Sequence, residues 1–330
     1  MTPLIINHKI YGKQKITEPV LIELIKSPAL QRLKHIEQHG TWQWHQDWKK
    51  ENYFSRYYHS VGVMLVLKRF NASVEEQLHG LLHDVSHTVF SHVADFLFGN
   101  DPGTHDYQDN RLAKSFKLQG IDKILKKYGF ESSHILDDKK FPLAERDLPD
   151  LCADRIDYTL SDPWAKTFYT TSPKKILDNL TVHKNQFVFK NRFGAKEFAS
   201  LYEKHNYNNW CNPLQIAIFT LSAQILREAL NKKIISKKEL YATDEYVLKK
   251  LRRTNNPVIV KKLEQIKKLK IRIVPKDQAD FWSTSKPRAV DPYFLQKGKL
   301  IRLSKVDTAY KKRIAKWVKK IKKGFWIKIV

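Results

Sequence analysis

Residues 81–98 constrain the chain most tightly, because they set titratable side chains into an otherwise apolar segment. The segment reads LLHDVSHTVFSHVADFLF, and its apolar residues recur near a helical period, which predicts a mostly buried helix. Its titratable residues are His83, Asp84, His87, His92 and Asp95. Buried ionised groups are costly unless they are paired or bind a metal, so these side chains indicate one shared site. The alternative is a pair of core histidines accompanied by surface acids.

Further candidate partners lie on both sides of this segment. Upstream the chain reads Arg56-Tyr57-Tyr58-His59, and downstream it reads Asp154-Arg155-Ile156-Asp157-Tyr158, with Asp162 one turn later. This order of a histidine, an adjacent His-Asp pair and a distant aspartate resembles the HD-domain metal phosphohydrolases. The resemblance is strongest to the branch that holds the dGTP and dNTP triphosphohydrolases. It covers residues 5–162 and fades afterwards.

The resemblance assigns roles to individual residues. It implies the metal ligands His59, His83, Asp84 and Asp154. It implies the catalytic residues His87, His92, Asp95 and His105, with His92 protonating the leaving oxygen and Asp95 orienting it. It implies the substrate contacts Gln38, Arg56, Arg155, Tyr158 and Asp162. Relatives carry Gly, Gly and Pro where this chain has Ser86, Thr88 and Val89, so the shape of the substrate pocket is expected to differ.

The expected cofactor is a divalent metal ion. Imidazole suits Mn, Fe, Ni or Zn, and carboxylates also accept Mg, so two histidines and two aspartates do not name one ion. The reaction that the resemblance implies is hydrolysis of a nucleoside triphosphate to nucleoside and triphosphate. Two alternatives stay open: a phosphatase or phosphodiesterase acting on another nucleotide or on nucleic-acid ends, and a non-catalytic module that binds nucleotides or nucleic acid.

The predicted fold is mainly α, with an HD-domain helical bundle at 1–230 and a smaller basic α+β region at 231–330. Residues 231–330 hold 30 basic and 8 acidic residues, a net charge of +22, which leaves only +4 of the total of +26 for the rest. Such a block attracts polyanions and suggests a nucleic-acid partner, although solvated surface lysines would give the same composition.

Local patterns predict several further elements. We expect a hairpin at 176–190, long helices at 195–210 and 214–230, strands at 271–274 and 300–303, and an amphipathic lysine-rich helix at 308–323. The aromatic stretch at 41–54 is expected to pack a loop onto the core rather than to stack on a base.

The remaining expectations concern location and assembly. No run approaches the ~18 apolar residues of a membrane span. The amino terminus lacks a secretory pattern, and only two cysteines, Cys152 and Cys211, are present. We therefore expect a cytoplasmic protein. The resemblance implies that it binds a nucleotide substrate, and we also expect a homo-oligomer.

Overall fold

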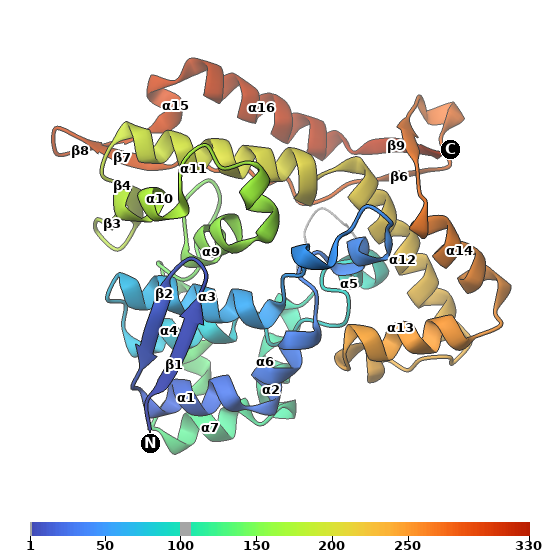
Figure 1. Ribbon diagram of the computed structural model, residues 1–330, viewed down its shortest axis with the longest axis horizontal. Helices are drawn as coiled ribbons and strands as arrows, with labels where there is room; N and C mark the ends of the chain where they lie inside the picture. Colours follow the sequence, from blue (N-terminus) through green and yellow to red (C-terminus); the bar gives the residue numbers. More distant parts are fainter. Residues whose placement is uncertain (1, 100–106) are drawn as a thin grey trace.

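The computed structural model describes residues 2–99 and 107–330, and this part of the chain is mainly helical, as expected (Figure 1). The α-helices are α1 (Pro19–Lys26), α2 (Pro28–Arg32), α3 (Arg56–Arg69), α4 (Val74–Leu82), α5 (Val93–Phe98), α6 (Leu112–Leu118), α7 (Ile121–Lys127), α8 (Ser132–Ile135), α9 (Ala153–Ser161), α10 (Pro173–Asn179), α11 (Arg192–His205), α12 (Pro213–Asn231), α13 (Asp244–Arg253), α14 (Pro257–Lys267), α15 (Leu303–Val306) and α16 (Thr308–Lys323). The short 3-10 turns are η1 (Leu33–His35), η2 (Gly40–Trp44), η3 (Lys50–Asn52), η4 (Asp109–Arg111), η5 (Asp138–Lys140), η6 (Pro163–Thr167), η8 (Glu239–Tyr241) and η9 (Lys276–Gln278), and η7 (Asn206–Trp210) is a π turn.

The strands are short and form three small sheets. They are β1 (Leu4–His8), β2 (Gly12–Ile16), β3 (Leu180–Val182), β4 (Phe187–Phe189), β5 (Ile271–Ile273), β6 (Phe281–Ser283), β7 (Tyr293–Gln296), β8 (Lys299–Arg302) and β9 (Phe325–Ile329). The sheet orders are β1-β2, β3-β4-β7-β8 and β5-β9-β6. The antiparallel pair β3-β4 confirms the hairpin predicted over 176–190 only from Leu180 onward, because residues 176–179 belong to helix α10. Its turn residues Lys184 and Asn185 have positive φ.

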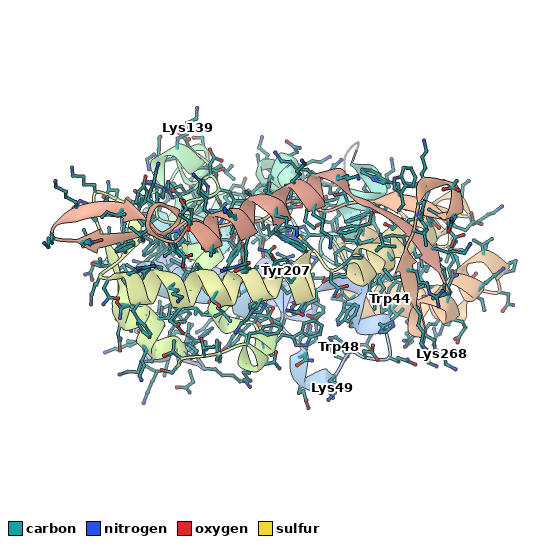
Figure 2. All side chains as sticks on the ribbon, turned by 90° about the horizontal axis from the view of Figure 1, so that it is seen from above. Trp44, Trp48, Lys49, Lys139, Tyr207 and Lys268 are labelled. Carbon is teal, nitrogen blue, oxygen red and sulfur yellow. The ribbon has the colours of Figure 1, made fainter. Side chains whose placement is uncertain are left out.

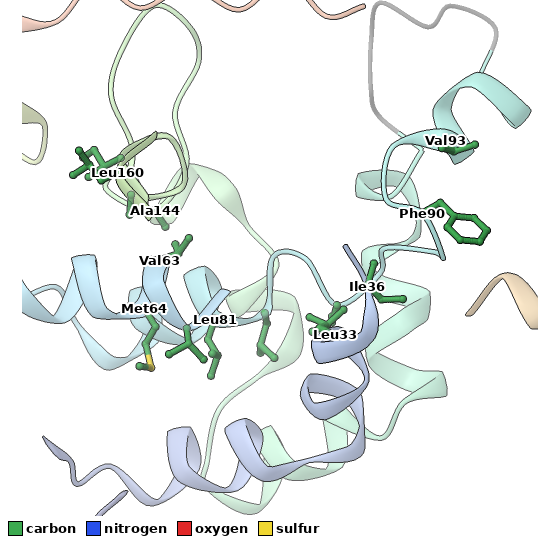
Figure 3. Close-up of a cluster of buried hydrophobic side chains, with 14 of the residues drawn as sticks. Leu33, Ile36, Val63, Met64, Leu81, Phe90, Val93, Ala144 and Leu160 are labelled. Atoms are coloured by element: carbon green, nitrogen blue, oxygen red, sulfur yellow. The ribbon is translucent and has the colours of Figure 1, made fainter. Parts of the chain in front are cut away.

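Helix α3 lies at the centre of the helical part and packs against α4 and α9. Ser55 caps its start by accepting a hydrogen bond from Tyr58 N, and Ser73 caps α4 in the same way through Glu76 N. Figure 3 shows Val63 and Met64 of α3 in a buried apolar cluster, near Leu81 of α4 and Leu160 of α9. The helix that carries Arg56 and His59 is therefore buried on nearly all sides, which fixes both side chains in place.

The single helix predicted over residues 81–98 is wrong. Helix α4 ends at Leu82, residues 83–92 form successive turns, and α5 begins at Val93. Arg32 Nη2 donates to the carbonyls of Val85 and His87, at 3.1 and 2.8 Å, which removes acceptors that a continuing helix would use. Phe90 and Ser91 adopt positive φ of 60° and 51°, a left-handed conformation that stops the helix. The histidines of this segment thus lie on turns, and not on one helical face.

The aromatic stretch 41–54 packs onto the core, as expected. The Trp42 and Trp44 side chains are buried, and Trp44 meets Phe90 edge to face with ring centroids 4.9 Å apart. Packing of Trp44 against Phe90 supports the left-handed turn that follows His83 and Asp84.

The C-terminal third lies against the helical part and shares its apolar core. Helix α16 has the predicted bounds and docks through Tyr310, Trp317 and Ile321, which are buried. Figures 1 and 2 show α16 running along α11, and the pair is joined by Arg313, which contacts Glu203 at 3.0 Å. Strands β4 and β7 pair across the predicted boundary at residue 231. The division into two domains stays a prediction.

Candidate functional site

A cavity of about 880 Å³ opens beside α3, α4 and α9. Predicted site residues that line it are Gln38, Arg56, His83, Asp84, His87, His92, Asp154, Arg155, Tyr158 and Asp162. His59 and Asp95 are buried and hydrogen-bond to residues of this lining. His105 lies outside the described residues. The structure thus gathers residues from four distant stretches of the chain around one cavity.

Three of the predicted ligands form a compact group. The ligand atoms of His59, His83 and Asp154 all lie within 4.8 Å of one another. Asp154 Oδ1 is 2.9 Å from His59 Nε2 and 3.5 Å from His83 Nε2. His83 Nε2 is buried and has no hydrogen-bond partner. A buried nitrogen without a partner, facing carboxylates, suits a metal ligand, so this donor set fits a divalent ion.

Asp84 lies next to this group and also contacts a cation of the protein. Its Oδ2 is 3.9 Å from His59 Nε2, and its Oδ1 is 3.4 Å from His83 Nε2. Arg56 Nη1 donates to Asp84 Oδ2 at 2.8 Å, and Arg56 Nε donates to Ser91 Oγ at 2.9 Å. Arg56 also lines the cavity, and its Nη2 is buried without a hydrogen-bond partner.

Asp157 hydrogen-bonds to the ring nitrogen of His59 that does not face Asp154. His59 Nδ1 donates to Asp157 Oδ2 at 2.8 Å, while Tyr11 Oη and Ser161 Oγ donate to Asp157 Oδ1 at 2.8 and 2.7 Å. A carboxylate on the second ring nitrogen orients a metal-binding histidine and makes it a better ligand. Gly62 faces this carboxylate so closely that a Cβ there would lie 2.1 Å from Asp157 Oδ1. The glycine is therefore required by the space that Asp157 occupies.

His59, His83, Asp84 and Asp154, the candidate metal group, contain ionisable side chains that influence one another strongly. Burial alone would lower the pKa of His59, but Asp154 and Asp157 outweigh burial and raise it to about 10. Burial would raise the pKa of Asp154, yet His59 and His83 hold it far below its usual range. The carboxyl of Asp84 also has a pKa well below its usual range, because Arg56 and the histidines outweigh burial. The carboxylates are ionised and ready to bind a cation.

A second group of potential ligands shares Asp154. It consists of Glu145, Cys152 and Asp154. Arg155 already brings a positive charge there, with Nη2 3.2 Å from Glu145 Oε1 and Nη1 2.9 Å from Cys152 Sγ. Because a guanidinium fills this group, it fits a second metal ion less well than the histidine-containing group does.

The predicted catalytic histidines stand side by side. The rings of His87 and His92 meet edge to face at 5.1 Å, and His87 Nε2 is 3.2 Å from Asp84 Oδ1. His92 Nδ1 donates to Asp95 Oδ2 at 3.0 Å, and Asp95 Oδ1 accepts from Tyr107 N at 3.0 Å. Burial, together with Arg56 and other cations, keeps the pKa of His92 well below its usual range, so its imidazole is neutral.

The predicted substrate contacts differ in how far the protein itself occupies them. Gln38 Oε1 is buried without a partner beside the cavity. Tyr158 Oη bonds to Tyr202 Oη at 2.8 Å. Asp162 Oδ2 accepts from His39 at 2.8 Å, and Asp162 Oδ1 accepts from Trp164 N at 2.9 Å. Arg155 is held by Glu145 and by backbone carbonyls. Gln38 is the predicted contact whose acceptor remains most open to a ligand.

The side chain of His39 occupies the carboxylate of Asp162, which makes that carboxylate less available to a ligand. Its ring bridges Glu37 Oε1 and Asp162 Oδ2, each at 2.8 Å. Burial alone would lower the pKa of His39, but Asp162 and Glu37 raise it to about 10, so the ring is an imidazolium. Sequence reasoning missed this bridge, although His39 directly follows Gln38.

Two cavity residues and one residue that supports the histidine-bearing turn come from the C-terminal third, and none of them was predicted. Lys286 and Arg288 line the cavity, and Asp244 accepts from the amides of Glu37 and Phe90 at 2.9 and 2.7 Å. Burial raises the pKa of Asp244 to about 7 despite these hydrogen bonds. No local sequence pattern marks these residues. Their place follows only from the fold, which brings the C-terminal third next to the residues of the HD motif.

No protein-family model matches the chain. Individual relatives do. The chain is 37% identical over 97% of its length to the uncharacterized protein YdhJ of Bacillus subtilis, covering 98% of that protein. It is 30% identical over 88% of its length to the metal-dependent phosphohydrolase cns2 of Cordyceps militaris, covering 84% of it. A solved phosphohydrolase from Bacteroides thetaiotaomicron shares the fold, with a TM-score of 0.73 and 16% identity over 99% of both chains.

These likenesses agree with the geometry of the site. A relative named as a metal-dependent phosphohydrolase matches most of the chain, and the histidine and aspartate group forms a site of the kind such an enzyme needs. Among the described residues, none of the helices has both the length and the apolar composition to cross a bilayer. The chain belongs to the HD-type metal-dependent phosphohydrolases.

Proposed function

We propose that the cavity hydrolyses a phosphate ester of a nucleotide, with His59, His83, Asp84 and Asp154 as the ligands of one divalent ion. The observation that carries this proposal is the convergence of His59, His83 and Asp154 within 4.8 Å at a large cavity, with a partnerless nitrogen on His83. A divalent ion there would lower the pKa of a bound water and neutralise charge on the phosphoryl oxygens.

Other residues of the cavity would bind the phosphoryl oxygens and supply the proton for the leaving oxygen. Arg56 offers its buried Nη2 to a phosphoryl oxygen while its Nη1 keeps Asp84 in position. Asp95 holds His92 through Nδ1, so Nε2 is the nitrogen that would give a proton to the leaving oxygen. His92 is neutral without substrate, and the negative charge of a bound phosphate favours its protonated form.

The substrate that we propose first is a deoxynucleoside triphosphate, cut to deoxynucleoside and triphosphate. This proposal is supported by Gln38, Tyr158 and the turn residues His87 and His92, which line the cavity together with His83, Asp84 and Asp154. The cavity also contains Trp210, whose ring meets Tyr158 at 4.8 Å, and aromatic rings of this kind can stack on a base. A volume of about 880 Å³ lies within the range of nucleotide-sized pockets.

A second candidate is hydrolysis of a single phosphoryl group from another nucleotide or from a nucleic-acid end. It is favoured by the ion pairs that Arg56 and Arg155 make with Asp84 and Glu145 of the protein itself. These carboxylates offset part of the positive charge of the cavity, which leaves less of it for a triphosphate than the number of lining cations alone suggests.

We also propose a partner, an assembly state and a cellular location. The outward lysines of α16 would take up single-stranded nucleic acid, since they are exposed while the apolar side of the helix is docked. A homo-oligomer in the cytoplasm is the assembly and location we expect for such an enzyme.

Product analysis tests the proposal. Purified protein would be incubated with each dNTP and with nucleoside monophosphates, in the presence of Mn²⁺ or Mg²⁺, with and without single-stranded DNA. Release of triphosphate supports the first substrate, and release of orthophosphate supports the second. Equal release by an Asp154→Asn variant would reject the assigned site.

A further inference from the structure

The three-stranded sheet β5-β9-β6 turns one face to the core and the other face outward. In its central strand, β9, Phe325 and Ile327 are buried, whereas Trp326 is half-buried and Lys328 is exposed. Successive side chains of a strand point to opposite faces, so Trp326 and Lys328 share the outer face. Figure 1 shows this sheet at one end of the molecule, beside the C-terminus and away from the cavity of the proposed active site.

Two tryptophans are paired across neighbouring strands of this outer face. Trp282 of β6 lies directly opposite Trp326 of β9 in the antiparallel register. Side chains at opposed positions of one face are neighbours, with Cβ atoms about 5 Å apart. The side chain of Trp282 is 40% exposed. Large apolar side chains that lie together on a surface mark interaction sites, whereas scattered ones do not.

The ring of Trp282 is held in place by the end of α16. Its Nε1 donates to the carbonyl of Lys323, the last residue of that helix, at 3.1 Å. The ring also lies against Gly324, where a Cβ would be 2.5 Å from Trp282 Cε2 and Nε1. Because the ring is fixed before binding, a flat partner stacks on it with little loss of conformational entropy.

Positive charge surrounds the two rings. Lys276 Nζ lies over the Trp326 ring, 5.5 Å from its centroid. Arg272 of β5 lies directly opposite Lys328 of β9, and both side chains are exposed. The carboxylate of Asp280, at the start of β6, accepts a backbone amide of β9 at 2.7 Å. Like charges at opposed positions of a sheet repel one another, and a bound polyanion would relieve this repulsion.

We propose that this outer face binds single-stranded nucleic acid, with bases stacked on Trp282 and Trp326. The phosphates would lie at the flanking cations, which are Arg272, Lys276 and Lys328. Aromatic rings beside basic groups are the combination that binds single strands without sequence preference, and a duplex does not expose the flat faces of its bases. The proposal goes beyond the hydrolysis proposed above and does not rest on it. It adds a base-binding surface to the nucleic-acid contact proposed for α16.

Fluorescence anisotropy with a labelled oligothymidylate tests the surface on the full chain. Trp282→Ala and Trp326→Ala should each weaken binding about 5- to 150-fold, the contribution of one ring stacked on a base. Trp326→Phe keeps an aromatic ring, so it should bind more tightly than Trp326→Ala. Phe193→Ala is the matched control, because Phe193 is 52% exposed on α11, outside this sheet. The control should bind as the native protein does.

An abasic oligomer, which carries the deoxyribose phosphates without the bases, separates stacking from charge. The native protein and Trp326→Ala should bind it equally. Lys276→Gln should weaken binding of both oligomers and reduce the slope of log affinity against log salt by ~0.7, the effect of one lost phosphate contact. Lys13→Gln removes an exposed lysine of β2, in another sheet, and should leave binding unchanged.

The outcomes separate this surface from the other proposals. Native affinity for oligothymidylate in both Trp→Ala variants would overturn it, even if changes to the α16 lysines weaken binding. An equal loss on the abasic oligomer would also overturn it, because the tryptophans would then act without the bases. A native protein that binds no oligothymidylate refutes the surface and leaves the hydrolysis to product analysis. If Trp326→Ala unfolds, Trp326→Thr, which keeps a strand-forming residue there, decides the matter.

Discussion

Replacing Gly62 by alanine should weaken metal binding by displacing Asp157, the hydrogen-bond partner of His59. The added Cβ would lie 2.1 Å from Asp157 Oδ1, 2.5 Å from its Cγ and 2.8 Å from Oδ2, so the whole carboxylate must move by about 1 Å to reach ordinary contact. Asp157 is fully buried and accepts from His59, Tyr11 and Ser161 at 2.7–2.8 Å. A shift of that size breaks or bends these hydrogen bonds.

Two effects of known size follow. Overpacking in a well-packed interior costs about 1–3 kcal/mol of stability. Loss of the outer partner of a metal-binding histidine reduces metal affinity about 10- to 100-fold, equivalent to ~1.4–2.7 kcal/mol. We therefore expect Gly62→Ala to lower both the melting temperature and the affinity for Mn²⁺.

The assay is a calorimetric titration of metal-free protein with Mn²⁺, accompanied by thermal melts. Gly194→Ala is the matched control, because its Cβ would lie 2.7 Å from Asn179 Cβ and 2.8 Å from Phe189 Cδ1, in α11 and away from the metal group. The control should lose stability and keep its metal affinity. If Gly62→Ala binds Mn²⁺ as tightly as the native protein, the hydrogen bond from His59 to Asp157 does not strengthen metal binding. Asp157→Asn, which keeps the size of the side chain, offers the same comparison should Gly62→Ala fail to fold.

Four further outcomes are expected. His92→Ala should retain metal and lose about 10²- to 10⁴-fold in turnover, the usual contribution of a general acid, and unchanged turnover would make His92 a core residue. Asp84→Ala should contain less metal than the native protein by elemental analysis, and equal content would remove Asp84 from the ligands. Metal affinity should rise with pH by about tenfold per unit in neutral solution, because the His59 of the metal-free protein, whose pKa is about 10, must release its proton; a flat pH profile in Mn²⁺ titrations would contradict this. If the α16 lysines bind single-stranded DNA, log affinity should fall with log salt by ~0.7 per phosphate contact, and Lys→Gln changes there should flatten the slope in filter binding.

The sequence was a good guide where a signal is local. The alternation at 176–190 identified a hairpin, although its first four residues belong to α10, and the lysine-rich periodicity at 308–323 identified α16 with its bounds. The same periodicity misled over residues 81–98, because Arg32 and Asp244, far away in the chain, hold the carbonyls and an amide of that segment in turns. Tertiary contacts of this kind override a local helical pattern.

In the candidate site too, residues within a local motif could be predicted, and residues placed by long-range contacts could not. The HD motif identified the residues that gather as the metal group, since each lies within a short recognisable phrase such as Arg56 to His59. Lys286 and Arg288 sit in a stretch that reads only as a basic loop, so nothing local marks them as cavity residues. The engagement of Asp162 by His39 was also hidden, because two side chains 123 residues apart decide it.

The contact between Asp244 and Phe90 bears on how the protein matures during synthesis. Asp244 follows Phe90 by 154 residues. At ~5–20 residues per second, the turn that carries the histidines emerges from the ribosome about 8–30 s before the residue that fastens it. We expect nascent chains stalled before Asp244 to expose this turn to protease, and chains stalled well beyond it to protect it. A polypeptide abandoned halfway through translation would then carry the whole HD motif and yet be unable to close it into a working centre.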